Sequence, residues 1–157
     1  FQRQSKAILP LMAVVQTAKG KVRPVLDYRA LNEFVSSHTA ESLVCAEKLR
    51  KWRKMGTSLE IVDLRRAYLQ IKVDRSLWSY QVIHYEGQAW CLTRLGFGLN
   101  AAPKIMRRIM DHVLGADPYV KEAADAYYDD IIIDSTKVSV ERVKEVLDSF
   151  GLETKPR

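Results

Sequence analysis

The spacing of apolar residues along the chain switches between the period of a strand and that of a helix, so both kinds of element are expected. Short apolar runs bounded by turn-forming residues predict strands. We expect them over 12–16, 22–27, 58–64 and 126–134, and as a hairpin over 80–95 that turns at Glu86-Gly87. Apolar residues three or four apart predict helices over 40–55, 100–115 and 138–151, and a short helical turn in 65–74.

The helical periods also predict which side chains face inward. In the first helix these are Leu43, Ala46, Leu49 and Trp52, and in the last helix Val140, Val143, Leu147 and Phe150. In the middle helix the buried side is Ile105, Met106, Ile109 and Met110. The order of elements in the second half favours an α+β fold with one antiparallel sheet and helices packed on one face.

Composition narrows the class of protein. The chain has 157 residues, about one domain, and its 47% apolar and 28% charged content is that of a soluble globular protein. A net charge of +6 favours an anionic partner such as nucleic acid. Cys45 and Cys91 lack a CxxC spacing and no His/Cys cluster occurs, so a zinc site is not expected. No apolar run is long enough to predict a membrane span, and no signal peptide is visible.

The stretch "ADAYYDDIIIDS" places Asp129 and Asp130 directly before three isoleucines. Two like charges at the end of a buried strand raise the pKa of one carboxyl and destabilise the fold unless a cation neutralises them. Asp63 stands in the same local situation, after Ile61-Val62. If the two strands are neighbours, three carboxylates meet at one edge, which suits Mg²⁺ and in-line phosphoryl transfer. A solvated turn or a helix cap is the alternative.

Four blocks then resemble the fingers and palm of reverse transcriptases, most like those of LTR retrotransposons and retroviruses. They are "VRPVLDYRALN", "EIVDLRRAYLQI", "LGFGLNAAPKIMRRIM" and "YYDD", in the family's order, and together they cover nearly the whole chain. The resemblance implies a polymerase palm, ferredoxin-like, with a partial fingers subdomain. It places the fingers at 1–57 and the palm at 58–157.

The resemblance also implies roles for individual residues. Asp63, Asp129 and Asp130 would be catalytic and would bind two Mg²⁺ ions (or Mn²⁺), together with the backbone at Leu64. The incoming nucleotide would be contacted by Arg23, Lys19, Tyr68, Arg65, Arg66, Phe97 and Gly98. In this set Tyr68 is the gate that excludes a 2′-OH, and Lys21 is the alternative to Lys19. Phe97 stands where retroviral enzymes have glutamine, as is typical of retrotransposons.

Primer and template contacts are expected at Tyr127 and Tyr128 and along a basic helix face. Lys104, Arg107 and Arg108 share that face, which would lie near the template backbone. The run "EKLRKWRK" at 47–54 is either half core and half solvated helix or a second nucleic-acid patch. Asp27 and Arg29 are expected to pair structurally, and Lys155 matches loosely the loop that assists proton transfer to pyrophosphate.

We therefore expect an RNA-directed DNA polymerase that extends a primer on an RNA or DNA template with dNTPs. The chain reads as part of a cytoplasmic retroelement Pol polyprotein, within virus-like particles or outside them, whose thumb, connection and RNase H regions lie elsewhere. Two alternatives stay open. One is an RNA-dependent RNA polymerase palm, and the other is a non-catalytic nucleic-acid-binding or assembly module derived from such an enzyme.

Overall fold

The computed structural model describes residues 5–36 and 45–156, so the start of the helix predicted over 40–55, with Leu43, lies outside the described residues. The chain divides into two compact units. Unit 1 comprises Phe1–Ser37 and Ile71–Ala102, and unit 2 comprises His38–Gln70 and Pro103–Arg157. No described helix has the length and apolar character needed to cross a membrane.

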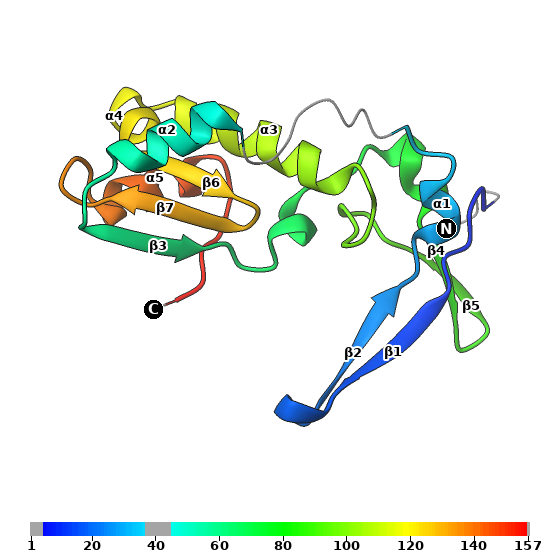
Figure 1. The fold of residues 1–157 in the computed structure, drawn as a ribbon. Coiled ribbons are helices and arrows are strands. Elements are labelled where there is room, and N and C mark those ends of the chain that lie inside the picture. The colour runs from blue at the N-terminus through cyan, green and yellow to red at the C-terminus, as the bar shows by residue number, and fades with distance from the viewer. Residues whose placement is uncertain (1–4, 37–44, 157) are drawn as a thin grey trace. The chain divides into compact units, whose positions relative to one another are not determined.

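Unit 1 is built on two hairpins. Strand β1 (Leu11–Gln16) pairs antiparallel with β2 (Lys21–Leu26), and the 3₁₀ turn η1 (Thr17–Lys19) and Gly20 join them. Strand β4 (Val82–Tyr85) pairs with β5 (Gln88–Cys91) over the predicted Glu86-Gly87 turn, where both residues have positive φ. A short helix α1 (Arg29–Asn32) and the 3₁₀ helix η3 (Arg75–Tyr80) complete the unit (Figure 1).

A buried tyrosine explains one glycine of the "LGFG" block. The Tyr28 hydroxyl donates a hydrogen bond of 2.5 Å to Gln81 Oε1, and the Gln81 amide donates to the carbonyls of Leu92 and Arg94. A Cβ on Gly96 would lie only 1.7 Å from the Tyr28 hydroxyl oxygen. Only glycine therefore lets the chain pass Tyr28 at this point, and burial raises the pKa of Tyr28 to about 12.

Unit 2 contains a three-stranded antiparallel sheet in the order β3-β7-β6. The strands are β3 (Leu59–Asp63), β6 (Ala124–Tyr127) and β7 (Asp130–Asp134). Ile131 and Ile133 are fully buried, and Val62 and Ala126 lie opposite Ile131 and are also buried. Residues one position away point to the other face, where Asp63, Asp125 and Asp130 lie.

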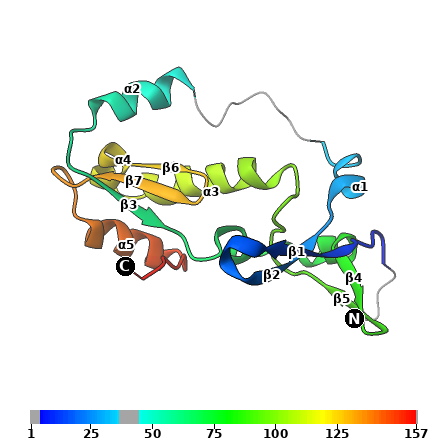
Figure 2. The same ribbon diagram turned by 60° about the horizontal axis from the view of Figure 1, so that its bottom comes forward.

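The described residues of unit 2 also form five helical segments: α2 (Ala46–Lys54), the 3₁₀ turn η2 (Ala67–Gln70), α3 (Ala102–Gly115), α4 (Pro118–Ala123) and α5 (Val140–Ser149). The predicted α3 and α5 are confirmed, and Ser139 caps α5 by accepting from the Arg142 amide. Figure 2 shows α5 and α2 on opposite sides of the sheet. The α2 helix therefore lies outside the one-sided helix layer that the sequence predicted.

Several local predictions were wrong. The hairpin over 80–95 forms a two-stranded sheet of its own in unit 1 and does not extend the sheet of unit 2. Residues 126–134 do not form one strand: they comprise the end of β6, a two-residue turn and the whole of β7. Leu49 and Phe150 are each 45% exposed: α2 turns Lys48 inward instead, and Phe150 follows the end of α5 with its ring against His112.

Candidate active site

The three predicted carboxylates meet at one end of the sheet in unit 2. In the register of β3 and β7, Asp63 lies opposite Asp130, and the Leu64 amide donates a 3.0 Å hydrogen bond to the Asp129 carbonyl. One carboxylate oxygen from each of Asp63, Asp129 and Asp130 lies within 4.8 Å of the others. Strand pairing therefore brings together acidic residues that are far apart in the sequence.

A tight turn between β6 and β7 presents Asp129. Tyr127 pairs with Asp130 across the hairpin, which leaves Tyr128 and Asp129 as the two turn residues. Tyr128 has φ +55, a left-handed conformation that is uncommon for a bulky side chain. Its ring lies edge-on against Tyr127, with 4.7 Å between the ring centroids. Both tyrosines are partly exposed beside the carboxylates, as a contact to a primer end requires.

The electrostatics of the cluster favour a bound cation. Burial raises the pKa of Asp130, and the charges of Asp129 and Asp63 raise it further, while Lys155 acts in the opposite direction. Lys155 donates a hydrogen bond from its ammonium to Asp63 Oδ2, which raises the pKa of Lys155. Asp63 Oδ1 is buried without a hydrogen-bond partner. Oxygen ligands, mutual repulsion and one unsatisfied carboxylate oxygen fit a hard divalent ion such as Mg²⁺ or Mn²⁺.

The segment after Asp63 is held against the end of the chain. The Arg65 amide donates to the Glu153 carbonyl at 2.9 Å, and the Gln70 amide group donates to the carbonyls of both residues. Arg66 takes a left-handed φ of +48, and Arg65 lies 3.7 Å from Glu153 in an exposed ion pair. Leu64 is fully buried, so only its backbone is available for the predicted metal contact.

Tyr68 lies in the same neighbourhood. Burial raises the pKa of its hydroxyl, and the charges of Asp129 and Tyr128 raise it further. The role of Tyr68 toward a sugar remains a prediction.

The other predicted nucleotide contacts belong to unit 1. Lys19 ends η1 at the tip of the first hairpin, Arg23 is exposed on β2, and Phe97 is 74% exposed. Gly98 has φ +106 and packs against Tyr28. The expected structural pair is confirmed, since Arg29 Nη2 lies 2.7 Å from Asp27 Oδ2.

The predicted basic face of α3 is only partly open. Arg108 is exposed, whereas Arg107 is largely covered and pairs with Asp111 at 3.8 Å, and Lys104 is half-buried. The buried side is narrower than predicted, because Met106 and Met110 are fully buried while Ile105 is 36% exposed. A template contact by these three residues remains a prediction.

Sequence reasoning missed Asp125 and Lys48. The two side chains form an ion pair of 3.3 Å and are each only 9% exposed. One signal was present: an aspartate between two alanines in a buried strand needs a partner. Nothing in the local sequence identifies Lys48 as that partner.

With this geometry established, comparison with known proteins identifies the family. The chain belongs to the reverse transcriptase family, described as "Reverse transcriptase (RNA-dependent DNA polymerase)", which matches residues 14–156. It corresponds to the fingers–palm region of the retrotransposon and retrovirus Pol type. The predicted family and the predicted α+β fold class are thereby confirmed.

Two curated relatives are a protein of Caenorhabditis elegans and one of Drosophila melanogaster. The first, uncharacterised protein K02A2.6, is 29% identical over 91% of the chain. The second, the retrovirus-related Pol polyprotein from transposon 297, is 32% identical over 76% of the chain. The chain spans about a tenth of each relative's length, since it covers 11% of both.

Solved structures of foamy virus protease-reverse transcriptase share the fold. The native prototype foamy virus enzyme aligns with a TM-score of 0.78 at 20% identity, over 97% of this chain and 20% of that one. A foamy viral enzyme solved in complex with an RNA/DNA hybrid gives the same TM-score at 22% identity, over 99% and 21%. Another, solved with double-stranded DNA, gives 0.75 at 23% identity, over 98% and 32%.

Proposed function

We propose that this chain is the fingers–palm core of an RNA-directed DNA polymerase in a retroelement Pol polyprotein. It adds dNTPs to a primer 3′-OH on an RNA or DNA template. The observation that carries the proposal is the cluster of Asp63, Asp129 and Asp130, whose carboxylate oxygens lie within 4.8 Å of one another. Thumb, connection and RNase H regions are expected in the rest of the polyprotein, and the division into fingers at 1–57 and palm at 58–157 is part of the same proposal.

Asp63 and Asp129 would hold the ions, and Asp130, whose carboxyl has a raised pKa, would support them. The chemistry that two bound Mg²⁺ ions supply in such a site is a lowered pKa of the attacking hydroxyl and neutralisation of the charge on the departing pyrophosphate. Hydrogen bonds from the Arg65 amide to the Glu153 carbonyl and from Gln70 to the Arg65 carbonyl fix the course of the backbone from Leu64 to Arg66, which this proposal places along the triphosphate.

The remaining side chains have orienting roles in this proposal. Tyr68 excludes a ribose 2′-OH, and the rings of Tyr127 and Tyr128 contact the primer end. Arg23 and Lys19 bind phosphate oxygens, for which a guanidinium fork is well suited, and Phe97 and Gly98 lie along the nucleotide. Lys104, Arg107 and Arg108 contact the template backbone without reading its sequence.

Primer extension with Mg²⁺ tests the proposal. The wild-type chain is offered dNTPs and NTPs separately on a primed RNA template, beside Asp129→Asn and a matched control, Asp148→Asn, on the exposed surface of α5 in the same unit. Extension with dNTPs that only Asp129→Asn abolishes supports the proposal. Extension with NTPs alone would favour the RNA polymerase alternative. Binding of primer–template without extension, also in the polyprotein that contains the chain, would favour the non-catalytic module.

Tyr68→Ala tests the choice of sugar separately. Removal of the ring should leave dNTP extension measurable and increase the incorporation of NTPs by about tenfold or more, because a steric exclusion is lost. An unchanged ratio of dNTP to NTP incorporation would contradict the gate role of Tyr68.

A further inference from the structure

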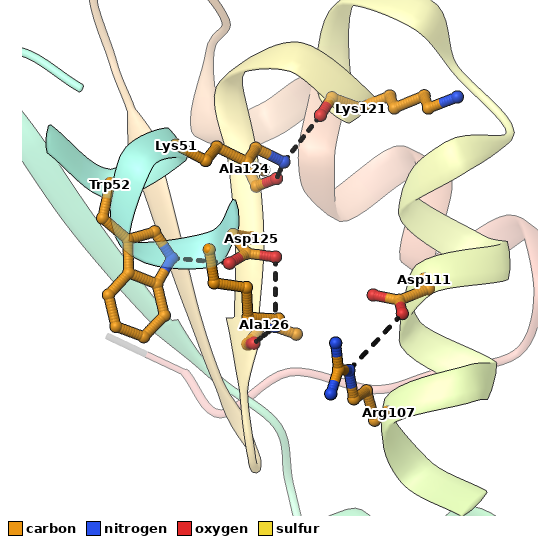
Figure 3. Close-up of polar contacts among 9 residues, drawn as sticks. Lys51, Trp52, Arg107, Asp111, Lys121, Ala124, Asp125 and Ala126 are labelled. Carbon is orange, nitrogen blue, oxygen red and sulfur yellow. Dashed lines mark hydrogen bonds and ion pairs between the residues drawn. The ribbon is translucent and has the colours of Figure 1, made fainter. Parts of the chain in front are cut away.

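The β6–β7 turn that presents Asp129 is held from the outside by α2. Strand β6 is at the edge of its sheet, with β7 on one side only. Edge strands have backbone carbonyls without a strand partner. Here Lys51 donates to the Ala124 carbonyl at 2.6 Å (Figure 3). Lys48 donates to the Ala126 carbonyl, also at 2.6 Å. Two lysines one helical turn apart thus take the place of a neighbouring strand.

The side chain between these two carbonyls completes the contact. Asp125 accepts from Lys48 at 3.3 Å on Oδ1 and from the Trp52 indole nitrogen at 2.5 Å on Oδ2. Both side chains of this ion pair are only 9% exposed. Replacing a buried ion pair by apolar residues of similar volume is often neutral or stabilising, so such a pair is weak evidence for added stability. Its distinctive contribution is a fixed geometry, since every charged atom has a directed partner.

Three aromatic side chains in contact, Trp52, Tyr127 and Tyr128, link this ion pair to the turn that presents Asp129. Asp125 and Tyr127 are two residues apart on β6 and share one face of the sheet. Trp52 touches both, because its indole nitrogen binds Asp125 and its ring lies edge-on to Tyr127 with centroids 6.0 Å apart. Tyr127 in turn lies edge-on to Tyr128, which adjoins Asp129. Displacing Trp52 therefore disturbs the residues that set the course of the turn.

We propose that Lys48, Lys51, Trp52 and Asp125, called here the α2–β6 cluster, are positioning residues that fix the Tyr128–Asp129 turn for metal binding. The part that concerns metal and catalysis rests on the proposed function, whereas the part that concerns the turn does not. In this proposal, three residues of the basic run at 47–54, Lys48, Lys51 and Trp52, support the β6–β7 hairpin.

Two variants test the cluster. Trp52→Phe keeps a ring beside Tyr127 and removes the donor to Asp125. Lys48→Met with Asp125→Asn removes both buried charges together, so neither is left unpaired. The matched control is Arg142→Met with Asp117→Asn, an ion pair of 2.8 Å in the same unit that does not contact the turn. If the double variant does not fold, Trp52→Phe alone carries the test.

The first measurement is the set of backbone amide resonances, recorded by ¹H–¹⁵N NMR without metal. We expect both cluster variants to shift the amides of 127–130 and leave those of α5 in place, and the control to leave 127–130 unchanged. A folded cluster variant with wild-type resonances at 127–130 would overturn the proposal. So would a control that shifts them as strongly, because the effect would then be general loosening.

The second measurement is Mg²⁺ affinity, taken from the same resonances during a titration, with kcat for primer extension beside it. Loss of a supporting contact around metal ligands weakens metal binding or activity by about tenfold to a hundredfold, and we expect that range here with KM for dNTP little changed. Shifted amides, with no primer extension by the wild-type chain or by the polyprotein that contains it, would contradict the proposed function and leave the positioning role of the cluster standing. If the wild type extends primers but the cluster variants keep wild-type amide resonances at 127–130 and wild-type Mg²⁺ affinity, the proposed function stands and the positioning role is contradicted.

Discussion

The β1–β2 and β6–β7 hairpins of this chain carry opposite charges and are stabilised by different interactions. The β1–β2 hairpin presents Lys19 and Arg23, and its side chains are exposed: Val15 is 64% and Val22 is 63% exposed. The β6–β7 hairpin presents Asp129, and its strands contribute Ile131 and Ile133, which are fully buried. The first is held by its own backbone ladder, whereas the second is held by the core of unit 2.

The contrast distinguishes residues that bind a ligand from residues that stabilise the fold. Substitutions on an exposed two-stranded hairpin change what it can bind and hardly affect unfolding, because little apolar surface is buried there. Substitutions of the buried residues in the β6–β7 hairpin affect both binding and unfolding, since the same strands form the core and aim the carboxylates. Substitutions in the two hairpins should therefore differ in their effects on primer extension and on unfolding.

Asp129→Asn should lower primer extension by about a thousandfold or more, because a ligand that contributes several kcal/mol to the transition state is lost. The melting temperature of the metal-free protein should not fall, since the substitution removes repulsion from Asp63 and Asp130. Extension kinetics and thermal melting measure the two effects. Extension at a near wild-type rate would mean that the acidic cluster is not the catalytic centre.

Ile133→Ala should destabilise unit 2 by about 2–5 kcal/mol, the usual cost of truncating a fully buried isoleucine. Val15→Ala, the matched change on the exposed hairpin, should cost within about 0.5 kcal/mol. Denaturant unfolding of both variants gives the comparison directly. Equal costs would show that the β1–β2 hairpin is packed against something in the folded protein.

Arg23→Ala should raise KM for dNTP by about tenfold and leave melting unchanged, because a charge-assisted hydrogen bond contributes about 1.5–3 kcal/mol. Lys19→Ala and Lys21→Ala, measured in the same way, should identify the companion lysine by the larger rise in KM. A fall in melting temperature without a change in KM would contradict the binding role of the hairpin.

The smallest expected effect is on the stability at low pH that two ion pairs, Asp27–Arg29 and Asp117–Arg142, contribute. Hydrogen bonds from Arg29 hold the pKa of Asp27 at about 2, below its ordinary 3.8, and Arg142 lowers the pKa of Asp117. Both contributions to stability are therefore present above the unfolded pKa and are lost as pH falls through the folded one.

The Asp27–Arg29 pair is local and forms in part in the unfolded chain, whereas Asp117 and Arg142 meet only on folding. Asp117→Asn should therefore flatten the fall in melting temperature below about pH 4 more than Asp27→Asn does. Melting curves between pH 2 and pH 6 are the measurement. A steeper effect of Asp27→Asn would contradict the comparison.

Much of the candidate site could be predicted from sequence because its signals are local. The acid-rich strand ends, the Glu86-Gly87 turn and the order of the motifs each follow from a few adjacent residues. The α4 helix was missed although Asp117 and Pro118 form a regular helix start, with the Asp117 carboxylate accepting from the amides of Tyr119 and Val120. The start of α4 is therefore encoded in a few adjacent residues.

The faces of α2 could not be read from its period. Leu49 looked like a core residue, but Lys48 is the buried one, because Asp125 on β6 offers a charged partner where an apolar residue would find none. Gly96 is similar: its motif was visible, and the reason for a glycine appears only when Tyr28 is found against it.

The sequence by itself determined the family, the α+β class and the identity of the acidic residues, because propensities and motifs act over short stretches of chain. Only the tertiary structure decided that Asp63 lies opposite Asp130, that Lys155 pairs with Asp63 and that α2 supports β6. These contacts join residues dozens of positions apart, and their partners are chosen by strand register and burial. No local pattern specifies either.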